Sequence, residues 1–353
     1  MKAMDAIERA LGCLFGLALG DALGAPTEFL EVGEIRRRFG PMGPEEPSGR
    51  PARVTDDTQM ALAVAEALVE APRPLSPEGL EGPLRRAFVE WFASPENNRA
   101  PGRTCMAACG RLARGLGWIE ATDPNSKGCG ANMRVAPVGL LALQGVAAEV
   151  RGGVAQFQSA LTHGHPTALA ASELTAAVVA DLALGGSPEG LVGRLVEYAR
   201  SQRGVYREDW VGDLDKLWAG TSFGSTTGER MEKGWDECIE VLDNVRWGLE
   251  NRELYLLRED LPGIDPCEAT GEGWTAETAL GTGLLCFLLY PEEPVMAIRR
   301  AAVTGGDSDS IAALSGAFAG AYHGVGAWPA DWVGRIEYGD RLGALGRQLG
   351  EGL

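Results

Sequence analysis

Apolar residues recur along most of the chain at the three- and four-residue spacings of amphipathic helices. Sustained alternation of apolar and polar residues, the pattern of a half-buried strand, is not evident. The pattern predicts an all-α protein, a compact multi-helix bundle that forms a single domain over residues 1–353. Helices are expected over residues 3–20, 58–70, 77–93, 104–116, 132–146, 148–161, 166–184, 188–201, 228–249 and 274–290, then from 311 onward and in the amphipathic segment after 323.

Four glycines are spaced four residues apart near the N-terminus, which places the helical ones on one face of the first helix. They are Gly12, Gly16, Gly20 and Gly24. A face without side chains lets a second helix approach closely, and charges at Asp5 and Glu8 favour the core of a soluble bundle over a lipid contact or a signal peptide. No uncharged apolar run reaches about 18 residues, so no membrane span is expected. Asp21 and Glu28 are expected in the loop that follows.

Two other segments break the helical pattern. Residues 31–51 are charged and carry three prolines, which indicates a mobile flap or lid. Residues 203–265 are the least regular part of the chain and contain four scattered tryptophans, Trp210, Trp218, Trp235 and Trp247. Burial in the core is the default interpretation for these rings, and stacking on an adenine ring is the alternative.

The composition excludes some classes of function. The formal net charge is -17, with a pI near 4.7, so the surface would repel a nucleic-acid backbone and general nucleic-acid binding is not expected. A small anionic ligand stays compatible with this charge, since a bound metal and local arginines can reverse the sign at one site. Seven cysteines without a paired spacing indicate reduced thiols in a cytoplasmic protein.

Paired acids stand before an alanine-rich helical pattern at two distant places. Thr304 to Ser310 contains two glycines followed by Asp307 and Asp309, and Val54 to Gln59 contains Asp56 and Asp57. Either segment alone could be an ordinary helix cap, because Asp, Ser and Thr are preferred there.

Together the two segments suggest a different role. If the fold brings them together, four carboxylates share one small volume and need a cation or a proton between them. Oxygen ligands without His or Cys suit Mg²⁺ or Mn²⁺ better than Zn²⁺. The two segments therefore give a metal-site hypothesis.

These segments, in order with three others, resemble the ADP-ribosylglycohydrolase family, the relatives of dinitrogenase-reductase-activating glycohydrolase. The other three are Gly20 to Phe29, Asn132 to Pro137, and Leu161 to His163, so the resemblance spans roughly residues 10 to 325. It implies two divalent ions, Mg²⁺ or Mn²⁺, at the centre of a helical bundle. The ligands it implies are Thr55, Asp56, Asp57, Asp307, Asp309 and Ser310, the last of which is commonly Thr in the family.

The resemblance also implies an activity and further site residues. Family members cleave the bond between C1″ of the distal ribose and a side chain, often arginine, and release ADP-ribose from an ADP-ribosylated protein or small molecule. Glu28 is the candidate acid/base, and Asp56 and Asp309 are further catalytic candidates. The implied substrate contacts are backbone donors at Gly128 and Gly130, the side chains of Asn132 and Arg134, and His163 in a structural or ligand-contact role.

One departure from the family affects the substrate. Arginine-specific bacterial members carry an acid in the loop that matches residues 97–103, whereas this chain has Asn97, Asn98 and Arg99, with Glu96 only at the edge. An arginine linkage stays the first expectation, and serine-linked ADP-ribose and O-acetyl-ADP-ribose stay open. The alternatives to a hydrolase are a catalytically inactive ADP-ribose- or nucleotide-binding protein on the same scaffold and, more distantly, a two-metal phosphohydrolase.

Overall fold

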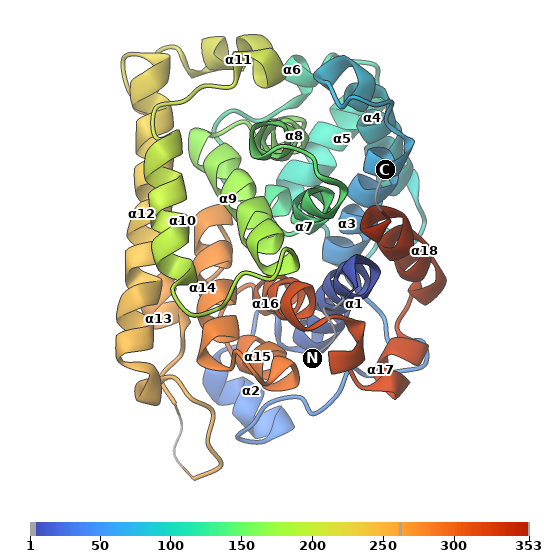
Figure 1. Ribbon diagram of the computed structural model, residues 1–353, viewed down its shortest axis with the longest axis vertical. Helices are drawn as coiled ribbons and strands as arrows, with labels where there is room; N and C mark the ends of the chain where they lie inside the picture. The colour runs from blue at the N-terminus through green and yellow to red at the C-terminus, as the bar shows by residue number, and fades with distance from the viewer. Residues whose placement is uncertain (1–4, 261–262, 352–353) are drawn as a thin grey trace.

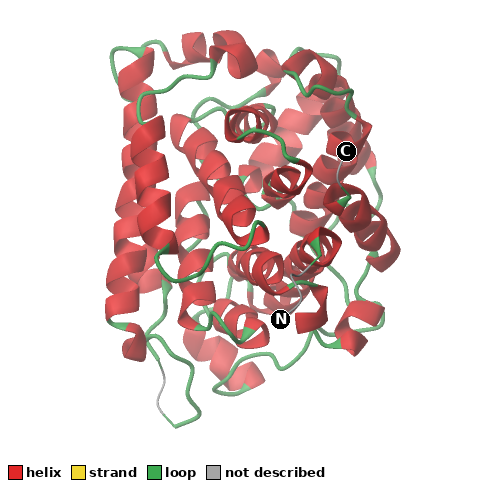
Figure 2. Ribbon diagram, in the orientation of Figure 1, coloured by secondary structure: helices red, strands yellow, loops and turns green. Residues whose placement is uncertain are grey.

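Helices make up the regular structure of the chain in the computed structural model, which describes residues 5–260 and 263–351. Within those ranges the only β-structure is four isolated bridges, and no strand occurs (Figure 2). The prediction of an all-α protein is therefore confirmed. The first nine α-helices are α1 (Ala6–Gly24), α2 (Val32–Phe39), α3 (Asp56–Glu70), α4 (Pro77–Ala93), α5 (Arg103–Ala113), α6 (Trp118–Ala121), α7 (Ala136–Leu140), α8 (Ala148–Ala160) and α9 (Pro166–Ala183).

The second half of the chain continues the bundle (Figure 1). Its helices are α10 (Leu191–Gln202), α11 (Glu208–Val211), α12 (Thr227–Glu250), α13 (Cys267–Thr270), α14 (Ala276–Leu289), α15 (Pro294–Ala301), α16 (Ser308–His323), α17 (Ala330–Arg335) and α18 (Gly339–Gly350). One large cluster of buried apolar side chains joins helices from both halves of the chain.

Helices α1 and α16 pack with their backbones in direct contact at the centre of the molecule (Figure 1). A Cβ atom added to Gly16 would lie 2.2 Å from the carbonyl oxygen of Gly316, and one added to Gly20 would lie 2.0 Å from that of Ala312. The contact is reciprocal, because a Cβ on Gly320 would lie 1.9 Å from the oxygen of Gly12. Real Cβ atoms do not approach backbone this closely, so only glycine fits. The predicted role of the glycine face is confirmed.

The first helix is longer than predicted. It continues past Gly20 to Gly24, so Asp21 lies in the helix and is fully buried, and its expected position in a loop was wrong. Glycine is a weak helix former, and its recurrence suggested an end at Gly20. Packing against α16 outweighs that preference.

Residues 31–51 contain a helix that the lid interpretation missed. The apolar side chains of α2 fall at Val32, Ile35 and Phe39, and Ile35 is fully buried against Leu257 and Val303. Farther along, the Arg335 guanidinium donates hydrogen bonds to the carbonyl groups of Pro47 and Gly49. The segment is thus packed against two distant parts of the chain.

Residues 132–146 also differ from the prediction of one helix. The structure has the 3₁₀ turn Cys129–Ala131, the short helix α7, and a second 3₁₀ turn, Leu141–Gln144. Pro137 occupies the first turn of α7, as expected, because its fixed φ and missing N–H suit that position. Helix α7 therefore begins at Ala136, one residue before Pro137, and not at residue 132.

The four tryptophans of residues 203–265 differ in burial. Trp218 and Trp235 are fully buried, Trp210 is half-buried against Phe157, and Trp247 is half exposed.

The seven cysteines are all free thiols. Two segments are long and apolar enough to span a membrane by length and composition, Ala6–Thr27 and α9, but 83% and 89% of their apolar windows are buried inside this fold.

The packing of α1 on α16 gives a stability test. Replacing Gly20 by Ala forces the backbones of α1 and α16 apart and should lower the free energy of unfolding by about 3 kcal/mol or more, measured by denaturant titration. Gly193→Ala is the matched control. It lies in helix α10 with nothing within 4 Å of an added Cβ, and should be neutral or slightly stabilising. Equal effects at the two positions would contradict the close-packing account.

Candidate functional site

A cavity of about 440 Å³ lies where the two acidic segments meet. Its wall comes from seven separate parts of the chain. The lining residues are Glu28, Phe29, Asp56, Asp57, Ala100, Pro101, Gly102, Arg103, Thr104, Cys105, Gly128, Cys129, Gly130, Met133, His163, Trp274, Asp307, Asp309 and Ser310.

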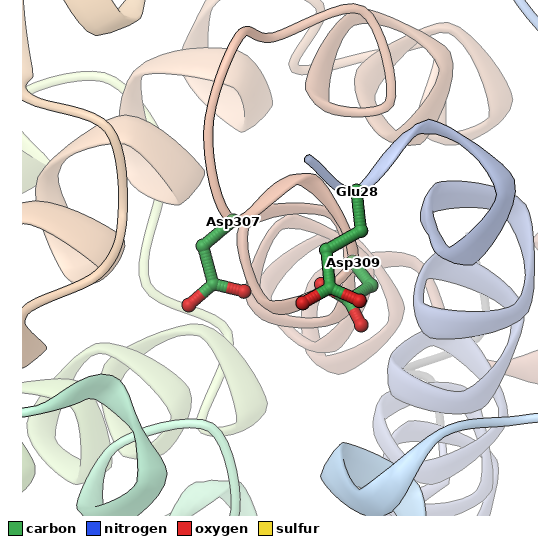
Figure 3. A group of neighbouring side chains, drawn as sticks. All are labelled: Glu28, Asp307 and Asp309. Carbon is green, nitrogen blue, oxygen red and sulfur yellow. The ribbon is translucent and has the colours of Figure 1, made fainter. Parts of the chain in front are cut away.

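The acids of the second segment lie at the start of α16. Asp307 occupies the N-cap position, but its side chain makes no capping hydrogen bond. Asp309 lies in the first turn, where its Oδ1 accepts a hydrogen bond from the Ser310 amide at 3.0 Å. An ordinary cap therefore does not explain Asp307, whose carboxyl group faces the cavity instead (Figure 3).

The acids of the first segment lie at the start of α3. Here Thr55 is a true N-cap, because its Oγ1 accepts a hydrogen bond from the Asp57 amide at 3.3 Å. Asp56 Oδ2 accepts a hydrogen bond from the amide of Gly102 at 3.3 Å, which ties it to the opposite wall. Thr55 itself is buried and does not line the cavity.

Asp21 holds the start of α3 in place. Its carboxylate accepts hydrogen bonds from the Thr55 amide at 2.9 and 3.0 Å and from the Thr58 amide at 3.1 Å. These amides belong to the unsatisfied N-terminal groups of a helix, so a buried carboxylate fits there. This role of Asp21 was not predicted from the sequence, although Asp21 lies in the segment Gly20 to Phe29.

Glu28 lines the cavity from the loop that follows α1. It follows the 3₁₀ turn Ala25–Thr27 and is anchored by Thr27, whose hydroxyl donates to the Gly24 carbonyl at 2.7 Å and pairs with the Ser308 hydroxyl at 2.9 Å. One carboxylate oxygen from each of Glu28, Asp307 and Asp309 lies within 4.8 Å of the others (Figure 3).

Burial and mutual repulsion raise the pKa values of the acids. Burial, reinforced by the neighbouring Asp309 carboxylate, raises the pKa of Asp21 and of Asp56 to about 7 and that of Glu28 to about 9. Burial likewise raises the pKa values of Asp57, Asp307 and Asp309. Like charges in a region of low dielectric cannot all ionise without compensating positive charge.

The donor set fits a hard divalent cation. Asp57 Oδ1 is buried and has no hydrogen-bond partner. Arg103, exposed at the cavity edge, is the one Lys or Arg among the lining residues. Carboxylate and hydroxyl oxygens that no lysine or arginine side chain neutralises are the ligands that Mg²⁺ and Mn²⁺ prefer. A cation would supply the positive charge that these residues lack.

His163 and the glycine turn form another part of the wall. Burial and the charge of Arg134 lower the pKa of His163 to about 3, so the ring is neutral, and its Nδ1 pairs with the Thr162 hydroxyl at 2.7 Å. A Cβ on Gly130 would lie 2.5 Å from Cys105 Sγ and 3.0 Å from the His163 ring. A larger residue at position 130 would therefore displace the Cys105 side chain or the His163 ring.

Asn132 and Arg134 do not reach the cavity, contrary to the expected substrate contacts. Both are fully buried. The Asn132 side-chain amide donates to the Ala276 carbonyl at 2.9 Å. The Arg134 guanidinium donates to Gln158 and, at 2.8 Å, to the Thr162 hydroxyl that pairs with His163. Arg134 thus positions His163 from behind.

The loop before α5 supplies the wall opposite Glu28. Arg99 faces away from the cavity and forms a half-buried ion pair with Glu337, and it also donates to the Val54 carbonyl. This pairing fixes the following residues, Ala100 to Gly102, which do line the cavity. Arg99 therefore has a structural role in this loop and does not line the cavity.

Sequence reasoning missed the aromatic part of the site. None of the four tryptophans of residues 203–265 lines the cavity, whereas Trp274 does, together with Phe29. Both belong to segments that were noted for other reasons, and nothing in their spacing indicates that they meet.

Comparisons with known proteins agree with this geometry. The family model described as ADP-ribosylglycohydrolase matches residues 2–353. The ADP-ribosylarginine hydrolase Tri1 of Pseudomonas putida is 26% identical over 364 residues, which cover 98% of this chain and 78% of Tri1. The ADP-ribosyl-[dinitrogen reductase] glycohydrolase of Rhodospirillum rubrum is 25% identical, over 94% of this chain and 90% of its own.

A solved structure gives the same result for the fold. The structure described as an ADP-ribosylglycohydrolase-related protein complex superposes with a TM-score of 0.65 at 26% identity, and the match covers 98% of both chains. A further relative matches only locally, at 37% identity over 138 residues that are 43% of its length.

The raised pKa values predict how pH affects the metal-free protein. The pKa of Asp56 is about 7 in the folded chain and 3.8 in the unfolded reference, so between these values the folded state binds more protons. The stability of the chelator-treated protein should therefore fall as pH rises from 4 to 8. Asp56→Asn removes one such group and should raise that stability at pH 8 by roughly 1 to 4 kcal/mol, with little effect at pH 4.

The measurement is calorimetric unfolding in EDTA at both pH values. Glu240→Gln, at an exposed position on α12, is the control and should change neither value. A variant Asp56→Asn that is less stable than the parent at pH 8 would contradict the assignment of Asp56 to an uncompensated acidic cluster.

Proposed function

The chain belongs to the ADP-ribosylglycohydrolase family, and on that premise we propose that it is a divalent-metal-dependent hydrolase that releases ADP-ribose from a modified side chain or small molecule. The observation that carries this proposal is the cluster of five acids that lines one cavity with one exposed arginine at its edge. Without cations, such a cluster would repel ADP-ribose, which is itself an anion, so the cluster favours a site that works with bound metal.

The residues that would hold the cations are Asp56, Asp57, Asp307 and Asp309, with the hydroxyl oxygens of Thr55 and Ser310. Two Mg²⁺ or Mn²⁺ ions bound there would supply positive charge that binds ribose hydroxyl groups and polarises a water molecule. Thr55 is buried, and its hydroxyl donates to the Asp57 carboxylate at 3.3 Å, so its oxygen lies beside the other members of the set.

Glu28 is the candidate for proton transfer. A carboxyl group with a raised pKa keeps its proton near neutral pH and can give it to the departing nitrogen or oxygen. Cleavage at C1″ passes through an oxocarbenium-like state, and the carboxylates of Asp56 and Asp309 would stabilise its positive charge. Neutral His163 would contact the ligand without adding charge.

An arginine linkage is the proposed first choice of substrate. Two of the similar proteins are named for ADP-ribosylarginine and for ADP-ribosyl-dinitrogen reductase. The exposed Glu272 accepts a hydrogen bond from Nε1 of the cavity-lining Trp274 at 3.1 Å, so it adds negative charge near the cavity, which favours a substrate with a cationic guanidinium. Serine-linked ADP-ribose and O-acetyl-ADP-ribose are the other substrates to be tested.

A panel of three substrates tests the activity. We expect release of free ADP-ribose from ADP-ribosyl-arginine in Mg²⁺ or Mn²⁺, slower or no release from ADP-ribosyl-serine and O-acetyl-ADP-ribose, and no release in chelator. Chromatography of the products gives the answer. Binding of ADP-ribose without turnover of any substrate would identify an inactive binding protein, and the hydrolase proposal would fail.

Two variants separate metal binding from proton transfer. Asp307→Ala should lose bound metal and activity together, because it removes a ligand. Glu28→Gln should keep the metal but lower kcat by about 10² or more, the usual contribution of a general acid or base. Metal content by mass spectrometry and kcat are measured on both proteins. Metal retained by Asp307→Ala, or an unchanged rate in Glu28→Gln, would remove that residue from the proposed role.

A further inference from the structure

A second hollow, of about 330 Å³, lies between helices α4, α6, α8 and α11, in the upper part of Figure 1. It shares no lining residue with the acidic cavity at the starts of α3 and α16. Helix α5, whose 11 residues span about 16 Å, leads from the wall of that cavity toward the hollow. Three aromatic side chains and four acids make up most of this aromatic cleft: Trp118, Phe157, Trp210, Glu78, Glu81, Glu208 and Asp209.

Packing holds the three rings of the aromatic cleft in place. Both indoles contact the ring of Phe157, at centroid distances of 5.5 Å for Trp118 and 6.5 Å for Trp210, with interplanar angles of 81° and 58°. Phe157 is 1% exposed and forms the floor, whereas the two tryptophans are half-buried walls. Gly153 of α8 makes room for the Trp210 ring, since an added Cβ would lie 2.2 Å from its Nε1. The rings are therefore placed by the fold and are not loose surface side chains.

The short helix α11 carries three members of the aromatic cleft, Glu208, Asp209 and Trp210. It is anchored by the residue before it, because Arg207 Nε donates to the carboxylate of Glu173 at 2.8 Å, and Glu173 is 1% exposed. A bidentate pair of this kind fixes the geometry of both partners. Arg207 is thus committed to Glu173, and its charge does not neutralise the two acids that follow it.

The aromatic cleft is strongly negative. No Lys, Arg or His is among the described residues that line it. Glu81 pairs with Arg85 on α4, and the other three acids form no ion pair within the part of the chain that the structure describes. Acids in the first turn of a helix, such as Glu78 in α4, can simply complement the helix dipole. That explanation does not account for the aromatic walls, and ring faces beside unpaired carboxylates are typical of sites that bind an organic cation.

We propose that the aromatic cleft binds the guanidinium group of an arginine side chain that a protein partner presents. A guanidinium is planar, so it can stack on an indole ring while its N–H groups donate to the carboxylates of Glu208 and Asp209. An ammonium group would bind the acids as a point charge and would make less use of the flat walls. This site lies outside the acidic cavity, and its ligand does not depend on the proposed function.

The surface beside the aromatic cleft favours a chain segment over a free small molecule. A further hollow of about 410 Å³ adjoins the cleft, because Glu208, Asp209 and Trp210 line both. It adds an acid, Glu149, and an apolar contact at Val205, which is 41% exposed. One side chain occupies only the first hollow, whereas an extended segment reaches both. The net charge of -17 also attracts a basic segment to this protein.

The indole N–H signals in ¹⁵N NMR spectra, recorded in Mg²⁺ buffer, test the site directly. Trp118→Phe and Trp210→Phe each remove one signal and thereby assign the two signals of the aromatic cleft. Titration with N-acetylarginine amide should shift both signals saturably in the parent protein, whereas N-acetylcitrulline amide, its neutral isostere, should shift neither. Trp247, which lies on α12 outside the cleft lining, is the reference and should not move.

Three results of this titration would overturn the site. They are equal shifts with citrulline amide, an equally large shift of Trp247, and a shift of Trp274 alone, which would place the cation in the acidic cavity that Trp274 lines. Hydrolase activity does not enter the measurement, so a failure of the proposed function would leave its outcome unaffected.

Charge-matched variants separate the aromatic cleft from the overall charge. Glu208→Gln with Asp209→Asn should weaken the affinity for N-acetylarginine amide by about fivefold or more, because the carboxylates that accept its N–H groups are lost. Glu197→Gln with Glu240→Gln removes two exposed acids from α10 and α12, outside the cleft, and should change the affinity by less than about twofold. Equal weakening in the two double variants would assign binding to net charge and overturn the site.

A pair of peptides tests whether the partner is a chain segment. The first carries arginine at both ends of a Gly-Ser-Gly spacer, and the second carries arginine at one end and citrulline at the other. The first should bind about fivefold or more tightly, beyond the roughly twofold expected from having two equivalent arginines, because its second arginine reaches the hollow of Glu149. Glu149→Gln should reduce this advantage to about twofold. An advantage of only about twofold in the parent protein would overturn the segment as the partner.

Discussion

The direct backbone contact between α1 and α16 is the constraint on which the rest of the structure depends. Because a side chain at Gly12, Gly16, Gly20 or Gly24 would collide with the backbone of α16, the two helices can approach only in this register. The register brings the end of α1 to the start of α16, where Gly24 lies against Ser308 and Asp309. Glu28 and the second acidic segment therefore meet as a direct consequence of helix packing, and Asp21, on the same helix, fixes the start of α3 through its hydrogen bonds.

Gathering acids in this way destabilises the folded protein. Five acids line one cavity and a sixth, Asp21, is fully buried beside it, and burial with mutual repulsion raises their pKa values. The N-termini of α3 and α16 offset part of that cost, since helix N-termini carry partial positive charge. The apolar packing of the surrounding bundle has to offset the rest of this destabilisation. A site that destabilises the empty protein and is neutralised by its ligand is the expected compromise between stability and function.

Sequence reasoning predicted the local parts of this structure and missed the long-range ones. The glycine face of α1, the acids at two helix starts and Pro137 in the first turn of α7 all depend on neighbouring residues, and such patterns are visible in a sequence. Whether Arg134 faces the cavity or the core depends on Gln158 and Thr162, which come from a different helix and its end. The stack of Phe29 on Trp274 joins residues that are far apart in the chain, and Asp21 was misplaced because tertiary packing extended a helix through a glycine.

The cavity combines helix starts that packing holds in place with loops whose backbone is strained. The four aspartates lie at the starts of α3 and α16, whereas Glu28 lies in the loop after α1. Phe29 and Ala100, by contrast, lie on opposite walls of the cavity, and both are non-glycine residues with positive φ. Strained backbone persists only where surrounding contacts hold it. At Phe29 these contacts are the hydrogen bonds of the Glu28 and Leu30 amides and the aromatic stack with Trp274. Cations need ligands that stay in place, and aspartates at two helix starts would meet that requirement. Glu28 directly precedes the strained Phe29, so the candidate for proton transfer lies on a loop outside that framework.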